Sequence, residues 1–292
     1  MLELTVPPYH NSMPVKEFLR KAGLSLTLRR KIKHHGSLTC NGHPIGWNDP
    51  IVAGDRLLLT WPISTIAAGQ QSDLIIPYED EYLLIVDKPA GMLAHPTSRH
   101  EETSLANAIM YHYQTSGQAW GFHPVQRLDR LTSGLILVAK HSHIQHLLSG
   151  KHLRRVYLAL VTGRPDPPDG TVDAPLARKP GSIIERMVHP SGQEAITDYR
   201  LMDGNRSASL LEITLHTGRT HQIRVHMSHI GHPLLGDDLY GGARTVIDRQ
   251  ALHAASLSLS HPITGEAIQV NSPLPDDMRS ALRSLHLPDD PF

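Results

Sequence analysis

The chain contains one cysteine, no long hydrophobic run and no excess of charge of either sign. Because Cys40 stands alone among 292 residues, an internal disulfide and a cysteine-based zinc cluster are both excluded, which fits a reducing cytoplasm. No stretch reaches the ~18 consecutive apolar residues of a membrane-spanning helix. Residues 1–10 also lack the basic and then apolar layout of a signal peptide. We therefore expect a cytoplasmic protein with no membrane partner.

The whole-chain charge does not indicate a nucleic-acid-binding protein, because 28 basic residues balance 28 acidic ones. Any affinity for RNA must therefore come from local patches. One such patch lies between Ser12 and Gly36, where seven Lys or Arg residues accompany a single acid, a local net charge of +6. The length of the chain predicts about two domains.

The basic patch coincides with two predicted helices. Apolar residues at helical spacing predict the first helix over residues 12–23. The second is predicted over residues 26–35, with Ser25 as its N-cap and Gly36 just past its end. The exposed face of this second helix carries the basic residues Arg29, Arg30, Lys31 and Lys33. A hairpin turn at Asn41-Gly42 and a strand over residues 56–61 follow.

This order of two helices and short strands resembles the S4 RNA-binding module. In that family the basic second helix faces RNA phosphates, so the resemblance implies that Arg29, Arg30, Lys31 and Lys33 bind RNA. Without the resemblance, the same charges would indicate only a solvated helix face. The small, polar residues 62–72 predict a linker. We therefore expect an S4-like domain over residues 1–61 and a larger domain over residues 73–292.

The stretch that dominates the larger domain is HPVQRLDRLTSGLILVAK, residues 123–140. It places Asp129 between Arg127 and Arg130, ahead of a polar turn and an apolar run over residues 135–139 that predicts a buried strand. Asp129 is thus expected in a loop carried by a rigid strand, a common place for catalytic groups. On local chemistry alone, such an Arg-x-Asp-Arg cluster is more typical of a surface ion-pair network.

Residues 127–140 resemble the active-site motif of the RluA-type pseudouridine synthases, with a departure at Gln126, where that family usually has His. The resemblance implies that Asp129 is the catalytic carboxylate. It also implies that Arg127 fills the space left by the target nucleotide.

Two later stretches resemble further motifs of the same family. RRVYLALV, residues 154–161, implies that Tyr157 packs against the target base. HTGRTHQIRVH, residues 216–226, implies that Arg224 pairs with Asp129, with Arg219 as the alternative partner. A nearby arginine is chemically reasonable, because a pocket that excludes water disfavours an ionised carboxylate and an opposite charge restores it.

The resemblance implies an α+β fold, in which a small S4-like module precedes a catalytic domain built on a mixed, mostly antiparallel sheet. The implied activity is isomerisation of uridine to pseudouridine in structured RNA, with ribosomal RNA favoured over transfer RNA. This reaction requires no cofactor, and we expect a monomer. Attack by Asp129 at C1′, attack at C6 and abstraction of the 2′ proton all remain open.

Two other function classes are consistent with parts of the sequence. A catalytically silent RNA-binding or ribosome-assembly factor would need only the S4-like module. A glycoside hydrolase would also break a glycosidic bond, but that chemistry normally uses two facing carboxylates. We expect no metal site, because the histidine clusters at residues 141–146 and 221–232 lack the ligand spacing and partners of zinc sites.

Overall fold

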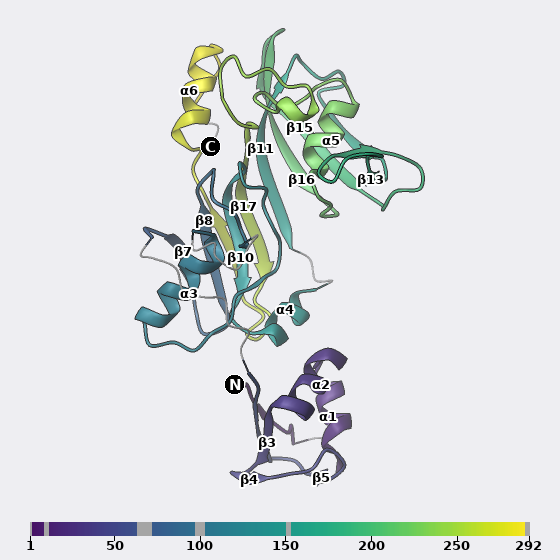
Figure 1. Cartoon of the computed structure of the whole chain (residues 1–292), viewed down its shortest axis with the longest axis vertical. Coiled ribbons are helices and arrows are strands. Elements are labelled where there is room, and N and C mark those ends of the chain that lie inside the picture. Colours follow the sequence, from purple (N-terminus) through teal and green to yellow (C-terminus); the bar gives the residue numbers. More distant parts are fainter. Residues whose placement is uncertain (1, 9–11, 63–71, 97–102, 150–152, 290–292) are drawn as a thin grey trace.

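The computed structural model describes residues 2–8, 12–62, 72–96, 103–149 and 153–289, which form a small N-terminal part and a larger part built on a long sheet (Figure 1). Most of the predicted linker, residues 63–71, lies outside the described residues. Within those residues, no helix is both long and apolar enough to cross a membrane.

The N-terminal part has two helices against a four-stranded sheet. The helices are α1 (Val15–Lys21) and α2 (Leu26–His35). The strands follow the order β1 (Leu2–Thr5), β6 (Arg56–Thr60), β3 (Ser37–Cys40) and β4 (His43–Pro44), while β2 (Met13–Pro14) pairs with β5 (Pro50–Ile51). Both predicted helices and the Asn41-Gly42 hairpin are confirmed; β1 was not predicted. All members of its apolar core come from this part, so the module has a core of its own.

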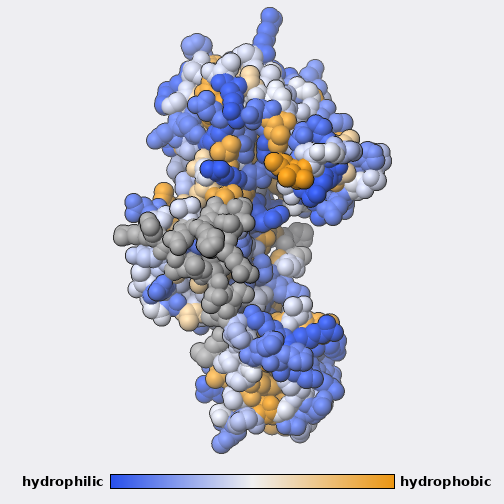
Figure 2. All heavy atoms as spheres, in the orientation of Figure 1, coloured by the Kyte–Doolittle hydropathy of each residue, from blue (hydrophilic) through white to orange (hydrophobic). Residues whose placement is uncertain are grey.

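Helix α2 separates its apolar and basic residues onto different faces. The Ser25 side chain accepts a hydrogen bond from the Leu28 amide at 3.1 Å, which caps the helix as predicted. Leu28 and Ile32 are buried in the module core. The basic side chains are exposed or half-buried, and hydrophilic atoms gather over the α1 and α2 side of this part in Figure 2.

The larger part is organised by one long sheet, which is mixed and mostly antiparallel, as predicted. Its main strands, in spatial order, are β12 (Asp169–Asp173), β15 (Ile196–Gly204), β16 (Ala208–Leu215), β11 (Arg154–Thr162), β17 (Leu252–Ser260), β10 (Ser133–Ala139), β8 (Leu83–Lys88) and β7 (Ile75–Glu79). Two more strands, β9 (His123–Pro124) and β18 (Ala267–Asn271), pair with β10 and β17. The pair β10–β17 is parallel and the other described pairs are antiparallel.

Helices cover both faces of this sheet. They are α3 (Leu105–Thr115), α4 (Ser142–Leu148), α5 (Gln222–His229), the short 3₁₀ turn η1 (Asp238–Tyr240) and α6 (Asp276–Ser284), and the hairpin β13 (Leu176–Arg178)–β14 (Arg186–Val188) lies beside α5. Alternate residues of β10 enter different cores: Ile136 packs with α3, and Leu137 packs with α4. The strand that follows the Asp129 loop is therefore buried on both sides, and it holds the loop rigidly.

Two long strands were not predicted. Residues 164–206 were expected to contain loops and short strands, but β15 has nine residues and pairs along β16. Strand β17, which lies between β10 and β11, was also missed. Its sequence LHAASLSLS consists largely of small residues, which give a weak strand signal by themselves.

Candidate active site

Asp129 lies in a loop whose backbone is hydrogen-bonded to a buried lysine. The Lys88 side chain is fully buried, and its ammonium group donates hydrogen bonds to the carbonyls of Pro89, Met92 and Arg130 at 2.8, 3.0 and 3.1 Å. The Thr132 amide also donates to the Asp129 carbonyl at 3.1 Å. These contacts hold the backbone at Asp129 and at the residue that follows it.

Gly134 allows the strand after this loop to approach β17 closely. Its φ of +108° lies in the region that favours glycine, and a Cβ atom there would lie 2.3 Å from the Ala254 carbonyl oxygen. Gly134 pairs with Ala254 in the parallel ladder between β10 and β17. The glycine of the TSG turn is therefore required by the contact between these two strands.

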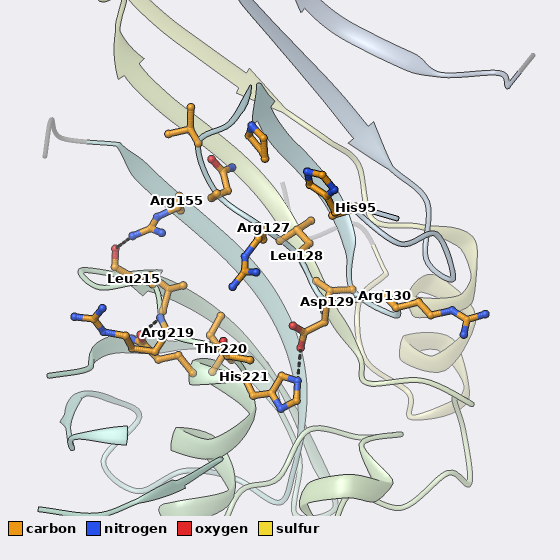
Figure 3. A pocket seen from close by; sticks show the side chains of 18 of the residues that line it. His95, Arg127, Leu128, Asp129, Arg130, Arg155, Leu215, Arg219, Thr220 and His221 are labelled. Carbon is orange, nitrogen blue, oxygen red and sulfur yellow. Dashed lines mark hydrogen bonds and ion pairs between the residues drawn. The ribbon is translucent and has the colours of Figure 1, made fainter. Parts of the chain in front are cut away.

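The Asp129 carboxylate faces a cavity of about 880 Å³. Its side chain is 28% exposed, so it is accessible from this cavity. In Figure 3, Arg127 extends into the same space, whereas Arg130 points away from it. The other lining side chains are mostly basic, polar or aromatic, and they include Arg155, Arg219, Thr220, His221, Arg224, Phe122 and Tyr157.

Arg224 joins the Asp129 carboxylate to a second, buried carboxylate. Its Nη1 lies 3.0 Å from Oδ2 of Asp129, while Nε and Nη2 donate to the two oxygens of Asp237 at 2.7 and 2.8 Å. The Arg224 side chain is 8% exposed and that of Asp237 is 1% exposed. Burial alone would lower the pKa of Arg224, but the carboxylates of Asp237 and Asp129 reverse this effect and raise it. The guanidinium therefore stays charged beside Asp129.

His221 occupies the position just before α5, with its side chain next to Asp129. Its Nε2 lies 3.7 Å from Oδ2 of Asp129, and its Nδ1 lies 2.8 Å from the hydroxyl oxygen of Tyr240 (Figure 3 shows the His221–Asp129 pair). Arg224 lies over the Tyr240 ring, 5.0 Å from its centroid. Burial lowers the pKa of His221, which favours the neutral form of the ring.

Tyr157 is an almost fully buried residue of β11 that lines the same cavity. The pairing of β11 with β17 shifts register between Val156 and Tyr157, an irregularity of the kind that redirects a side chain. Burial raises the pKa of Tyr157 to about 12, so its phenol stays protonated near neutral pH. The ring therefore offers the cavity an uncharged aromatic surface.

Gln126, the departure from the usual family pattern, is a buried residue of the cavity wall. Its Nε2 donates to the Leu135 carbonyl at 3.4 Å, and its Oε1 has no partner among the described residues. The residue thus belongs to the packing between the Asp129 loop and β10.

The predicted site residues lie in two separate places, the cavity at Asp129 and helix α2. Asp129, Tyr157, Arg224, Arg127 and Arg219 all line the one cavity, and Asp129 contacts Arg224 directly. Arg219 donates from Nε to the Glu194 carbonyl at 2.9 Å. The basic residues of α2 lie instead in the N-terminal part and do not line this cavity.

Sequence reasoning did not place His221 beside Asp129, nor Asp237 and Tyr240 beside Arg224 and His221. The spacing of His221 and Arg224 could have indicated that both side chains face Asp129, because residues three apart at the start of a helix lie on the same face. The partnership of Asp237 with Arg224 had no local signal, since the two residues meet only through the turn at η1.

The carboxylate pair of a glycoside hydrolase and a metal site are the two alternatives to compare with this geometry. Asp129 is the only carboxylate among the described residues that line the cavity. Within the described part of the chain, no cluster of three His, Cys, Asp or Glu side chains is placed to hold a metal ion.

The chain is similar to known proteins over most of its length. The family of RNA pseudouridylate synthases matches residues 82–229. An RNA pseudouridine synthase of Bacillus subtilis is 43% identical over 279 residues, which cover 93% of this chain and 99% of that protein. The ribosomal large subunit pseudouridine synthase D of Pseudomonas aeruginosa is 38% identical over 83% of this chain and 82% of its own length.

A solved structure supports the same fold. Human RNA pseudouridylate synthase domain containing 4 superposes with a TM-score of 0.60 at 24% identity, covering 73% of this chain and 93% of that one. The sequence similarity extends through the Asp129 loop, Tyr157 and Arg224. The chain belongs to the RNA pseudouridine synthase family, in its RluA-type branch.

Proposed function

We propose that this enzyme converts uridines of ribosomal RNA to pseudouridine, with Asp129 as the catalytic carboxylate. The observation that carries the proposal is the position of Asp129 in an open cavity, in contact with the buried, charged Arg224. The ribosomal substrate is suggested by relatives such as the large subunit pseudouridine synthase D of Pseudomonas aeruginosa.

The reaction breaks the N1–C1′ bond, turns the uracil and joins C5 to C1′. The proton on C5 is lost and N1 gains one, so no electrons and no group have to be supplied. An ionised Asp129 can act as nucleophile or base, and Nη1 of Arg224 donates a hydrogen bond to its Oδ2 at 3.0 Å. The neutral ring of Tyr157 can receive the base, and such stacking contributes about 1–3 kcal/mol per base.

The target nucleotide has to leave its stack before this chemistry, at a cost of a few kcal/mol. Arg127 extends into the cavity and carries no ion pair among the described residues, so its side chain can occupy the vacated position in the RNA. Arg219, on the opposite wall, is placed to contact the phosphate backbone.

The N-terminal part would supply affinity for RNA that does not depend on base identity. We propose that residues 1–61 form an S4-like domain and residues 73–292 the catalytic domain of a monomeric, cytoplasmic enzyme. Arg29, Arg30, Lys31 and Lys33 of α2 would then bind phosphates. Among the described residues, one carboxylate lines the cavity, and this disfavours a glycoside hydrolase, which normally uses two.

The test combines a cellular map with one variant. Pseudouridine is mapped by a carbodiimide-type readout in RNA from cells with and without the protein, and loss of a specific ribosomal signal is expected. Purified Asp129→Asn should have no turnover on that RNA but bind it within about twofold of the unaltered enzyme, because only the charge at the reacting group changes.

The matched control is Asp276→Asn, an exposed aspartate of α6, which should retain full turnover. Turnover by Asp129→Asn would refute the catalytic assignment. An unchanged map together with unchanged RNA binding would favour the silent RNA-binding factor.

A further inference from the structure

The two oxygens of the Asp129 carboxylate are in different surroundings. Oδ2 accepts from Arg224 at 3.0 Å and faces Nε2 of His221 at 3.7 Å. Within the described residues, no side chain pairs with Oδ1. One oxygen is therefore held by the protein, and the other is left for the substrate.

The hydrogen bonds of Tyr240 indicate which nitrogen of His221 carries the proton. The Tyr240 hydroxyl oxygen accepts from the Arg186 amide at 2.9 Å, so its own hydrogen is available to donate. The nearest acceptor is Nδ1 of His221 at 2.8 Å. Because the buried ring is neutral, its single proton then resides on Nε2, the nitrogen that faces Asp129.

The backbone also holds His221 in this orientation. Its φ of 58° and ψ of 20° are left-handed, a conformation that non-glycine residues seldom adopt. The next residues start α5, which carries Arg224 one turn later. The strained residue and the two contacts of its ring therefore present Nε2–H and the Arg224 guanidinium to the same carboxylate oxygen.

We infer that His221 is a positioning residue, whose neutral ring donates from Nε2 to Oδ2 of Asp129 and keeps Oδ1 turned toward the substrate. At 3.7 Å the contact is too long for a hydrogen bond in the free enzyme. It shortens when RNA fills the cavity, as catalytic hydrogen bonds commonly do in substrate complexes. The inference rests on the proposed function.

A protonated His221 ring would be less suitable than a neutral one for orienting the Asp129 carboxylate. The charged groups that face His221 are Asp129, Asp237, Arg224 and Arg186, from the Asp129 loop, the η1 turn, α5 and β14. Arg224 already supplies a full positive charge to Oδ2. A neutral donor orients the carboxylate without a second cation, which would reduce the reactivity of Asp129.

The kinetic test compares two substitutions at residue 221. His221→Asn tolerates the left-handed backbone but its amide is too short to reach Asp129, whereas the amide of His221→Gln can take the position of Nε2. We expect kcat to fall about 10–100-fold in His221→Asn, the range for loss of a hydrogen bond to a charged group, with KM within about twofold. His221→Gln should recover most of that loss.

The pH profile and a control separate positioning from general damage. The acidic limb of the kcat profile should move to higher pH in His221→Asn and return in His221→Gln, because a donor to the ionised carboxylate has been removed and replaced. His229→Asn, an exposed histidine at the end of the same helix, should match the unaltered enzyme. Equal losses in both residue-221 variants, or a kcat of His221→Asn within about twofold of normal, would overturn the inference.

A second measurement does not depend on turnover. With ¹⁵N-labelled histidine, NMR should show the Nε2–H tautomer for His221, identified by the signals lost in His221→Gln. Tyr240→Phe removes the donor to Nδ1 and should produce a mixture of tautomers. An Nδ1–H tautomer would overturn the inference even if the enzyme proved inactive on every RNA, whereas failure of the proposed function would appear separately as an inactive unaltered enzyme.

Discussion

Arg224 connects two carboxylates that lie on different segments of the chain. It uses Nη1 for Asp129 and Nε with Nη2 for Asp237. A planar guanidinium can make these three bonds at once, but a lysine ammonium concentrates its charge at a single nitrogen. The side chain therefore fixes the position of Asp129 relative to the buried Asp237.

Arg224→Lys should lower kcat about 10–100-fold, since it loses at least one hydrogen bond to a charged partner. Steady-state kinetics on the mapped RNA would measure the change. Arg200→Lys provides the control, because Arg200 pairs with Glu212 on the exposed surface of β15 and should leave kcat unchanged. Normal turnover in Arg224→Lys would show that the bridge is not needed.

The four basic residues of helix α2 differ in their exposure to solvent. Arg30 and Lys33 are exposed, whereas Lys31 is half-buried and Arg29 donates from Nε to the Leu24 carbonyl at 3.1 Å. Arg30 and Lys33 are therefore the best placed for phosphates.

The double substitution Arg30→Ala and Lys33→Ala should weaken RNA binding and reduce the slope of log K against log salt by about 1.5, since each phosphate contact contributes about 0.7–0.9. Turnover at saturating RNA should not change. The control replaces Arg206 and Arg283, two exposed arginines of the larger part, with alanine. An unchanged salt slope in the α2 variant would remove this helix from the RNA interface.

The parallel junction of β10 and β17 depends on Gly134. Gly134→Ala should destabilise the protein by about 3 kcal/mol, because the new methyl group meets the Ala254 carbonyl and the backbone is left-handed. Gly265→Ala is the matched comparison: its φ is +79° but nothing lies within 4 Å of the added Cβ, so about 1 kcal/mol of strain is expected. Urea denaturation would measure both, and equal losses would contradict the close contact.

The elements that sequence predicted are those with strong local signals. Helix α2 has a Ser25 cap, apolar residues at helical spacing and a terminal glycine, and β10 has a continuous apolar run. Strand β17, by contrast, depends on partners far away in the chain, because it pairs with β10 and β11, more than a hundred and almost a hundred residues earlier. No local pattern encodes such pairings.

The same distinction applies to the site. Motif resemblance indicated Asp129, Tyr157 and Arg224, and the structure brings all three to one cavity. The tautomer of His221 could not be predicted, because it depends on the Arg186 amide of the β13–β14 hairpin acting through Tyr240. Hydrogen-bond chains of this kind exist only after distant segments have packed.

For the molecule as a whole, buried histidines should make stability depend on pH. Burial lowers the pKa of His141 and His143 to about 4. Their unfolded values are near 6.5, so the unfolded state binds more protons between pH 6.5 and 4, and stability falls as pH decreases through that window.

Between pH 6.5 and pH 5 the two histidines together should cost about 3 kcal/mol, measured by urea denaturation. Most carboxylates remain ionised above pH 5, so they add little to this slope. Replacing both histidines with glutamine should remove this contribution and make the dependence shallower in this range. A stability that is already constant from pH 6.5 to 5 in the unaltered protein would mean that these rings are not held neutral.

Strand β17 lies between the strands that carry the site, since β10 follows the Asp129 loop and β11 holds Tyr157. It is made of residues 252–260, which follow Asp129, Tyr157 and Arg224 in the sequence. During synthesis, domains form as their segments emerge from the ribosome. A nascent chain that already includes Asp129, Tyr157 and Arg224 still lacks the strand that sets them side by side. The three site residues can therefore be brought together only after residues 252–260 have also left the ribosome.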